Sequence, residues 1–330
     1  MFKEIEIKLR ATAETLQAVK QSSFIEGYRC SDWQERSLDN QYFDTPCFRL
    51  ADARVALRIR KDAEQFIQTL KTKGSSVAGL SERNEWDWTI EAAQLDLSLL
   101  TDACWPQTLQ DLDKQQLQCI FHTDFTRQLV ELCWEHEGKA VRVEVALDQG
   151  QVRTNDGRSE SISEIELELR EGEPEALLQL AQELARQFPL MPCDISKAER
   201  GYRLLHPASF DLQLPMQGLT AETAMDSAIE ELAWQLLSGS QRLAEQYRYS
   251  KNWKLLQQWI YSLIQLRALL TGAGQIIPRK TSHALRQQLD ALLGDWLKFI
   301  DAGDNQELRQ QAESTFAAEL QLERWGVFSL

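Results

Sequence analysis

Charged and apolar residues alternate at the start of the chain, in the segment EIEIKLR. Glu4, Glu6 and Lys8 are each separated from the next by one apolar residue. A period of two is typical of a β-strand, because successive side chains point to opposite faces of it. The three charged groups would therefore share one face, where carboxylates could hold a metal ion and a cation could hold an anion. For this segment alone, a strand with its polar face in water is the simpler interpretation.

Five later segments repeat the pattern, and the repetition changes this interpretation. The charged residues that fall in phase are Arg58 and Arg60 in RVALRIR, Lys71 and Lys73 in QFIQTLKTKG, Arg83, Glu85 and Asp87 in SERNEWDWTI, Arg142, Glu144 and Asp148 in VRVEVALDQG, and Glu164, Glu166, Glu168 and Arg170 in ISEIELELREG. A β-sandwich shows mixed polar residues on its outer faces, whereas these faces are almost wholly ionic. We therefore expect a sheet closed around a charged lumen, with its apolar faces packed outward against helices. Such a lumen needs counter-charges to offset desolvation, and a polyanion bound with a divalent metal would supply them.

The composition excludes several classes of protein. The chain has 330 residues, 43% of them hydrophobic, which predicts one large or two ordinary folded domains. Its 36 basic and 50 acidic residues give a net charge of −14, which argues against nonspecific binding to nucleic acid or to an anionic membrane. We find no N-terminal apolar segment of the signal-peptide type and no run of about 18 apolar residues. We therefore expect a cytoplasmic protein with no membrane partner.

The cysteines are scattered along the chain, at Cys30, Cys47, Cys104, Cys119, Cys133 and Cys193. They form no CxxC pair, so their spacing indicates neither a zinc site nor a disulfide framework. We expect free, buried thiols.

The periodicity changes along the chain and predicts two domains. Residues 1–205 are rich in strand patterns, with a helix expected after REGEP, where Leu177, Ala181 and Leu184 share a stripe. The interval 206–220 has two prolines and little periodicity, so we expect a linker there. Residues 221–330 carry four helical stripes, which predict a small bundle. These stripes are Ile229, Leu232, Ala233 and Leu236; Leu256, Trp259, Ile260, Leu263 and Ile264; Leu285, Leu289, Leu292, Trp296 and Ile300; and Leu308, Ala312, Phe316 and Leu320.

Several motifs in the first domain resemble those of one known family. Glu4-x-Glu6-x-Lys8 is similar to the ExExK signature of the CYTH domain, which occurs in triphosphate tunnel metalloenzymes. The resemblance continues in order through YFDT, LRIR, TLK, the pair Arg83-x-Glu85, TDFTR, VEVALDQG, ELEL and SKAERGY, and it covers residues 4 to about 205. Within the family the chain looks most like bacterial inorganic triphosphatases that carry a second, helical CHAD domain. The segment GQIIPRKTSHALRQQL resembles a piece of a CHAD domain, here shortened and with His283 as its single histidine.

The resemblance implies a fold and a set of site residues. The fold is α+β: an antiparallel eight-stranded β-barrel with flanking helices, followed by a small all-α bundle. The implied phosphate-binding and catalytic cations are Lys8, Arg58, Arg60, Lys71, Arg83, Arg127 and Lys197, with Arg200 as a further candidate. The implied metal ligands are Glu4, Glu6, Glu166 and Glu168, of which Glu4 and Glu6 also belong to the catalytic set. Glu85, Glu144, Asp148 and Glu164 are second candidates that could equally be ion-pair partners of the cations. The implied cofactor is Mg²⁺ or Mn²⁺, with two ions bound.

The implied activity is metal-dependent hydrolysis of inorganic triphosphate to diphosphate and phosphate. Other members of the fold act on thiamine triphosphate or RNA 5′-triphosphate ends, or cyclise ATP to cAMP as adenylate cyclases, and the sequence does not separate these substrates. A different class of function is a polyphosphate-binding scaffold, in which the helical part recognises polyphosphate and the barrel is degenerate. For the helical part, we rank accessory or interaction roles ahead of polyphosphate binding, because its charges are interspersed. Asp44, in the turn-forming YFDTP, is expected to be structural.

Overall fold

The computed structural model describes residues 2–77, 80–193, 195–207, 220, 222–300 and 305–321. The chain divides into two compact units, one of 1–76, 80–179 and 195–211, the other of 77–79, 180–194 and 212–330. We describe each unit separately. Most of the expected linker 206–220 lies outside the described residues, which include only 206, 207 and 220 of it. The domain boundaries expected from the sequence stay a prediction.

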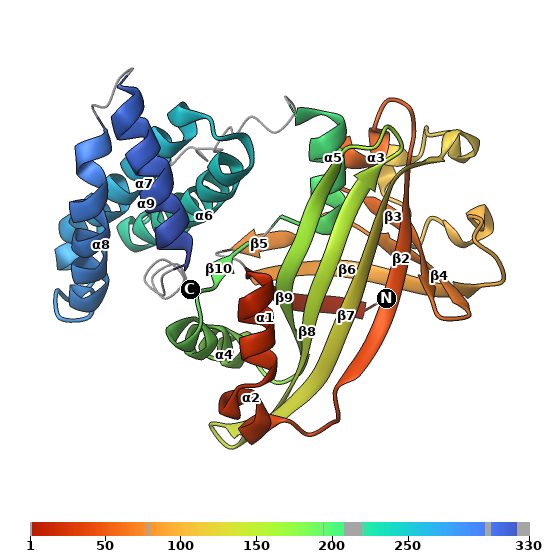
Figure 1. The fold of residues 1–330 in the computed structure, drawn as a ribbon, viewed down its shortest axis with the longest axis horizontal. Helices are drawn as coiled ribbons and strands as arrows, with labels where there is room; N and C mark the ends of the chain where they lie inside the picture. The colour runs from red at the N-terminus through yellow and green to blue at the C-terminus, as the bar shows by residue number, and fades with distance from the viewer. Residues whose placement is uncertain are drawn as a thin grey trace. The chain divides into compact units, whose positions relative to one another are not determined.

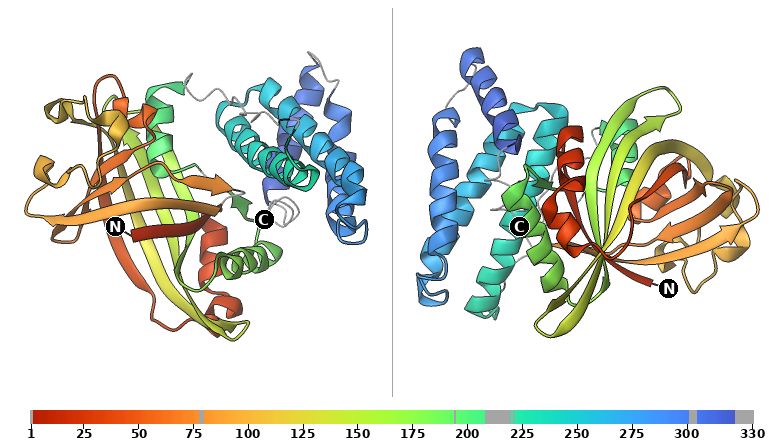
Figure 2. Two further views of the ribbon diagram at one scale, coloured as in Figure 1. Left: turned by 180° about the vertical axis from the view of Figure 1, so that it is seen from behind. Right: turned by 60° about the horizontal axis from the view of Figure 1, so that its bottom comes forward.

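The first unit contains a closed antiparallel β-barrel of eight strands, as expected (Figure 1). Neighbours around the ring follow the order β1, β9, β8, β7, β2, β3, β4, β6, and the ring closes because β6 pairs with β1. Figure 2 shows the strands curving round to meet. The barrel strands are β1 (Phe2–Arg10), β2 (Gln34–Asp44), β3 (Ala56–Asp62), β4 (Gln65–Lys71), β6 (Leu80–Ile90), β7 (Gln118–His136), β8 (Lys139–Thr154) and β9 (Ser159–Glu171). Two short strands lie outside the ring, β5 (Ser75–Val77) and β10 (Met191–Pro192).

The alternation in the sequence decides which side chains face the lumen. On β1, Glu4 lies opposite Arg83 of β6, and Lys8 lies opposite Glu166 of β9. The intervening Ile7 and Leu9 are fully buried on the outer face. Because the side-chain period of a strand is two, this register places Glu4, Glu6 and Lys8 of β1 inside, with Arg83 and Glu166 beside them.

Helices and short 3₁₀ turns cover the apolar outer faces. On β3 and β4, Leu57 and Leu70 pack in one cluster with Trp105 and Leu109 from the segment after β6. Burial of these side chains stabilises the barrel by about 1.5–3 kcal/mol for each large apolar residue. The helical elements of this part of the chain are α1 (Ala13–Lys20), α2 (Ser23–Tyr28), α3 (Arg49–Asp52), η1 (Leu97–Leu99), η2 (Gln107–Leu109), η3 (Lys114–Gln116), α4 (Pro174–Gln187) and α5 (Lys197–Leu205).

Helix α5 lies beside the ends of β8 and β9 (Figure 1). Ser196 caps it by accepting a hydrogen bond from the backbone N–H of Glu199 at 3.1 Å. Gly201 faces the Phe121 ring of β7 so closely that a Cβ atom would lie 2.3 Å from a ring carbon. The glycine therefore lets α5 seat directly against the barrel.

The second unit contains the four helices expected from the stripes. They are α6 (Met225–Ser250), α7 (Trp253–Gly272), α8 (His283–Trp296) and α9 (Gln306–Gln321), with 3₁₀ turns η5 (Ala273–Gln275) and η6 (Leu297–Phe299). Their core is largely leucine with a cluster of aromatic rings, in which Trp259 packs edge-on against Trp296 at 5.0 Å and against Phe316 at 5.6 Å. The side chain of Leu320, placed in the fourth stripe, lies outside the described residues.

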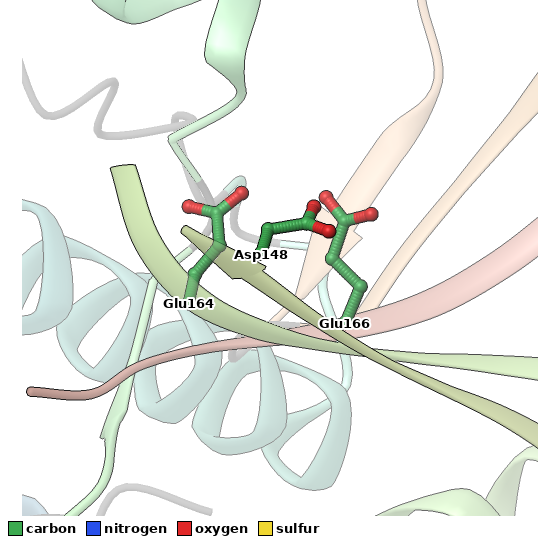
Figure 3. A group of neighbouring side chains, drawn as sticks. All are labelled: Asp148, Glu164 and Glu166. Atoms are coloured by element: carbon green, nitrogen blue, oxygen red, sulfur yellow. The ribbon is translucent and has the colours of Figure 1, made fainter. Parts of the chain in front are cut away.

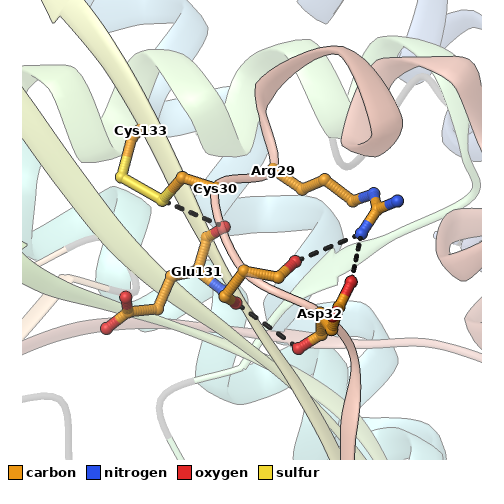
Figure 4. The surroundings of a disulfide bond; sticks show 6 residues. Arg29, Cys30, Asp32, Glu131 and Cys133 are labelled. Atoms are coloured by element: carbon orange, nitrogen blue, oxygen red, sulfur yellow. Dashed lines mark hydrogen bonds and ion pairs between the residues drawn. A yellow bond between two sulfur atoms is a disulfide. The ribbon is translucent and has the colours of Figure 1, made fainter.

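The cysteine prediction is wrong for one pair. Cys30 and Cys133 form a disulfide, and Cys47 is exposed rather than buried, whereas Cys104 and Cys193 are buried free thiols and Cys119 is half-buried. Arg29, next to Cys30, forms a β-bridge with Leu132 of β7, next to Cys133. Figure 4 shows the disulfide together with Arg29 and Glu131. The two cysteines are 103 positions apart, so only the tertiary contact of this segment with β7 brings them together.

Among the helices within the described ranges, we find none that is both long enough and apolar enough to cross a membrane.

Candidate active site

A cavity of about 250 Å³ lies inside the barrel, and its lining is mostly ionic. Nine cationic side chains line it: Lys8, Arg36, Arg58, Arg60, Lys71, Arg83, Arg127, Arg170 and Lys197. Eight carboxylates do so as well: Glu4, Glu6, Asp62, Glu85, Asp87, Glu144, Glu166 and Glu168. So many opposed charges in a small volume are costly to desolvate, which marks the cavity as the candidate site.

The structure brings the sequence-predicted residues together. All seven implied phosphate-binding cations and all four implied metal ligands line the cavity, as do the second candidates Glu85 and Glu144. The other second candidates, Asp148, Glu164 and Arg200, are fully buried behind the lining. There Asp148 and Glu164 contact the lining residue Lys197, and Arg200 contacts Glu164.

Sequence reasoning missed several lining residues. The alternation puts Arg170 and Asp87 on the charged faces of β9 and β6, but the resemblance assigns neither a role in the site. Tyr42 and Arg36 gave no such signal, because the other in-phase residues of β2 are Leu38 and Asn40. The missed lining residues with charged or hydroxyl side chains are Arg36, Tyr42, Asp62, Thr69, Asp87, Arg170 and Ser196.

One ionic cluster joins β1, β4 and β6. The Lys71 ammonium lies 2.8 and 2.9 Å from the two carboxylate oxygens of Glu4, and 3.1 Å from Glu85. Arg83 contacts both Glu4, at 3.2 Å, and Glu6. Burial opposes the charge of Glu6, but Lys8 and Arg83 outweigh it and hold the pKa of this carboxyl well below its ordinary value.

A second cluster surrounds the Lys197 ammonium, which α5 brings into the barrel. This group lies 2.6 Å from Asp148, 2.6 Å from Glu164 and 2.9 Å from Glu166. These carboxylates project to the same side from β8 and β9 (Figure 3). Burial alone would lower the pKa of Lys197, but the three carboxylates raise it above its ordinary value. The Lys197 ammonium thus occupies the position between the three carboxylates at which they could otherwise bind a metal cation.

Arg127 of β7 also contacts the carboxylates of this cluster. Its guanidinium binds Asp148 in a bidentate way, at 2.8 and 2.7 Å, and also contacts Glu166. Burial opposes ionisation of Glu166, yet Lys197, Lys8 and Arg127 hold its pKa well below the ordinary value. Both carboxylates therefore stay ionised without a metal ion.

Negative charge exceeds positive charge around Glu168. Its neighbour Arg170 also pairs with Glu144, at 3.1 Å. Burial raises the pKa of Glu168 to about 8, and Glu4 and Glu144 add to the rise against the opposing effect of Arg170. A carboxyl that stays protonated near neutral pH among other carboxylates indicates room for a further cation. Oxygen donors of this kind suit Mg²⁺ or Mn²⁺, so this donor set fits a hard divalent ion.

Positive charge exceeds negative charge on β3. Arg58 lies 3.7 Å from Glu85, at the edge of ion-pair distance. Arg60 has no carboxylate within 4.0 Å among the described residues, and its Nε donates to the amide oxygen of Asn40 at 2.8 Å. Burial, Arg58 and Arg127 together lower the pKa of Arg60. This part of the wall is suited to bind an anion, and guanidinium groups fit phosphate oxygens well.

Asp44 lies outside the cavity and has a structural role, as expected. Its buried carboxylate accepts hydrogen bonds from the backbone N–H groups of Thr45, Leu50 and Ala51 and from the Tyr202 hydroxyl. It therefore ties α3 and α5 to the end of β2.

Comparisons with known proteins agree with this geometry. The family model described as the CYTH domain matches residues 3–202, the part of the chain that contains the barrel. The inorganic triphosphatase of Haemophilus influenzae is 31% identical over 204 residues, which are 62% of this chain. The chain spans 55% of the length of that relative.

Solved structures are similar to a little over half of the chain. HpAC1 from Hippeastrum, described with a dominant triphosphatase activity, is 22% identical and has a TM-score of 0.39; the match covers 56% of this chain and 87% of HpAC1. The PH1819 protein of Pyrococcus horikoshii is also 22% identical, with a TM-score of 0.36 and coverage of 56% and 89%. The Mimivirus capping enzyme triphosphatase is 8% identical, with a TM-score of 0.31 and coverage of 55% and 88%.

Proposed function

The chain belongs to the CYTH domain family, and on this premise we propose that it is a metal-dependent hydrolase of inorganic triphosphate. The observation that carries the proposal is the division of the lumen. One arc of the barrel, formed by β1, β9 and β8, presents Glu4, Glu6, Glu166, Glu168 and Glu144. The opposite strand β3 presents Arg58, which lies 3.7 Å from Glu85, and Arg60, which has no carboxylate within 4.0 Å among the described residues. Such a lumen suits a polyanion together with divalent cations.

The charges of the lining support a metal requirement. With all groups ionised, as Glu168 would be beside a metal ion, nine cations against eight carboxylates leave one net positive charge. A triphosphate carries about four or five negative charges near neutral pH, so binding it alone would leave about three or four uncompensated. About two divalent ions would offset this excess, and such ions also activate the attacking water. We assign their binding to Glu4, Glu6, Glu166 and Glu168.

The cations of the chain then bind and orient the substrate. Arg58 and Arg60 would bind phosphate oxygens from β3. The other cations that would bind them, from the remaining strands and from α5, are Lys8, Lys71, Arg83, Arg127 and Lys197. Each of these except Arg60 contacts a carboxylate in the ligand-free state. Substrate phosphates would therefore replace carboxylates as partners of these cations. Catalysis would rest on neutralisation and positioning, with no covalent intermediate.

A panel of substrates tests the proposed specificity. Phosphate release should be measured from tripolyphosphate, ATP and thiamine triphosphate with Mg²⁺ or Mn²⁺, with cAMP monitored in the ATP reaction. We expect the highest kcat/KM for tripolyphosphate. A higher value for another substrate, or cAMP as the main product, would assign that activity instead. Binding of polyphosphate without turnover of any of them would favour the scaffold interpretation.

We further propose that residues 1–205 form the catalytic domain and that 221–330, a shortened CHAD-like domain, has an accessory role. All residues assigned to the site lie within 1–205. A fragment of residues 1–210 should keep tripolyphosphate hydrolysis. A folded fragment without activity would assign the helical domain a part in the site. Salt-sensitive binding of long-chain polyphosphate by the full-length protein, lost in the fragment, would replace the accessory role with polyphosphate recognition.

A further inference from the structure

Three residues on neighbouring strands form a polar chain along the inner face of the barrel. Asn40 of β2 lies opposite Arg60 on one side and opposite Thr123 of β7 on the other. Its amide oxygen accepts a hydrogen bond from Arg60 Nε at 2.8 Å, and its amide nitrogen donates to Thr123 Oγ1 at 3.0 Å. Asn40 and Thr123 are both fully buried. The chain therefore links a lumen arginine to two strands beside it.

Thr123 fixes the direction in which the Asn40 amide points. The amide nitrogen lies 3.4 Å from the backbone carbonyl oxygen of Thr123, which can only accept a hydrogen bond. A reversed amide would place its oxygen against this carbonyl and its NH₂ group against the N–H of Arg60. Both contacts would be repulsive, and neither group has water as an alternative partner in a buried site. The acceptor oxygen is thus held toward Arg60.

The interaction leaves the charge of Arg60 uncancelled. Every other cation that lines the cavity has a carboxylate within 4.0 Å among the described residues, whereas Arg60 has a neutral amide. A guanidinium has five N–H donors, and this contact uses the one on Nε. The two terminal NH₂ groups keep the fork that matches two oxygens of a phosphate.

From these contacts we propose that Asn40 is a positioning residue, which orients the Arg60 guanidinium for a substrate phosphate without neutralising it. An aspartate of the same shape at this position would orient the group equally well but would form an ion pair with it. An apolar residue at this position would leave the Arg60 guanidinium charged but would no longer fix its orientation. This inference rests on the proposed function, since it concerns the same lumen and the same anionic substrate.

A double-mutant cycle on tripolyphosphate binding tests the proposal. Dissociation constants should be measured by calorimetry for the wild type, Asn40→Leu, Arg60→Met and the double variant, with kcat and KM measured beside them. We expect Asn40→Leu to weaken binding about fivefold to tenfold in the wild-type background and less than twofold in Arg60→Met, because the amide acts through the guanidinium. Equal losses in both backgrounds would overturn the proposal, since a merely structural role does not depend on Arg60.

Asn40→Asp separates orientation from charge and keeps the shape of the side chain. We expect it to weaken tripolyphosphate binding more than Asn40→Leu does, at least tenfold, while the melting temperature of the ligand-free protein is unchanged or higher. The control Asn155→Asp makes the same chemical change at an exposed turn and should bind like the wild type. If Asn40→Leu does not fold, wild-type binding by Asn40→Asp overturns the proposal by itself.

The same measurements distinguish the two proposals. Tripolyphosphate that binds but is not hydrolysed by the wild type would contradict the proposed function, while the binding cycle would still decide the role of Asn40. Absence of tripolyphosphate binding by the wild type would overturn both.

Discussion

The Lys71 ammonium lies 2.8 Å from a carboxylate oxygen of Glu4, although β6 separates their strands in the sheet. The two side chains meet only because the sheet is closed and both point into the lumen. Their contact shows how the ligand-free barrel stays folded: its cations and carboxylates are partners of one another. Binding of substrate and metal must exchange these partners.

Glu4→Gln should therefore affect both stability and activity. Lys71 and Arg83 would each lose one charged partner, so we expect the free energy of unfolding to fall by about 1–3 kcal/mol. At saturating Mg²⁺, kcat/KM for tripolyphosphate should fall about 100-fold or more. Glu183→Gln, an exposed acid on α4 paired with Arg186, is the control and should stay within about twofold of the wild type. A wild-type rate in Glu4→Gln would contradict the role assigned to this carboxylate.

Arg58→Met and Arg60→Met should change stability in opposite directions. Burial disfavours the charge of Arg58, but Tyr42 and Glu85 raise its pKa, and at neutral pH the Glu85 carboxylate and a hydrogen bond with Tyr42 favour this charge. The pKa of Arg60 is instead lowered by burial, Arg58 and Arg127, so its charge destabilises the empty barrel at neutral pH.

Melting temperatures without ligand check this contrast. We expect Arg60→Met to melt about 2–4 °C higher than the wild type and Arg58→Met to melt lower by a similar amount, the shifts that correspond to about 1 kcal/mol in a domain of this size. Both variants should raise KM for tripolyphosphate about tenfold. Shifts of the same sign in the two variants would show that the local charge balance is misassigned.

Glu168 should make the stability of the metal-free protein depend on pH. Its pKa is raised to about 8 in the folded state, above its unfolded value. The contribution of Glu168 to the free energy of unfolding is therefore fully favourable below the pKa that this group has in the unfolded chain, and it is lost as pH rises through about 8. In the presence of chelator, the wild type should lose stability relative to Glu168→Gln between about pH 5 and pH 9. A difference in melting temperature that stays constant over this range would refute the prediction.

Gly201→Ala should displace α5 from the barrel. The added methyl group would lie 2.3 Å from the Phe121 ring, and overpacking of this kind costs about 1–3 kcal/mol. Because α5 carries Lys197, we also expect a lower kcat for tripolyphosphate. Gly27→Ala is the matched control, since a Cβ there meets no atom within 4 Å. Full stability and activity in Gly201→Ala would mean that α5 tolerates a shift.

The sequence predicted the barrel because its signal is local. Alternation placed Glu4 and Glu6 on one face, and ionic faces on several strands implied a closed lumen. Periodicity likewise predicted the helices that bury Trp259 and Trp296. These features depend on residues two to four positions apart, which any single segment displays.

Features that depend on strand register could not be predicted in this way. Asn40 and Arg60 meet because β2 pairs with β3, and no spacing in the sequence shows that pairing. Cys30 and Cys133 meet because the segment after α2 pairs with β7. Arg36 lacks charged neighbours in phase, so its position in the lumen also became evident only from the folded barrel.

The rate of phosphate release from tripolyphosphate, measured for the wild type with Mg²⁺ and again in excess chelator, tests the central claim most directly. Our account predicts turnover with the metal, loss of at least about 100-fold in chelator, and recovery when Mg²⁺ is restored in excess. Glu166→Gln, which alters a carboxylate between Lys8, Arg127 and Lys197, should not recover to the wild-type rate. Undiminished turnover in chelator, or no turnover of tripolyphosphate with Mg²⁺ or Mn²⁺, would contradict the proposal that the protein is a metal-dependent triphosphatase.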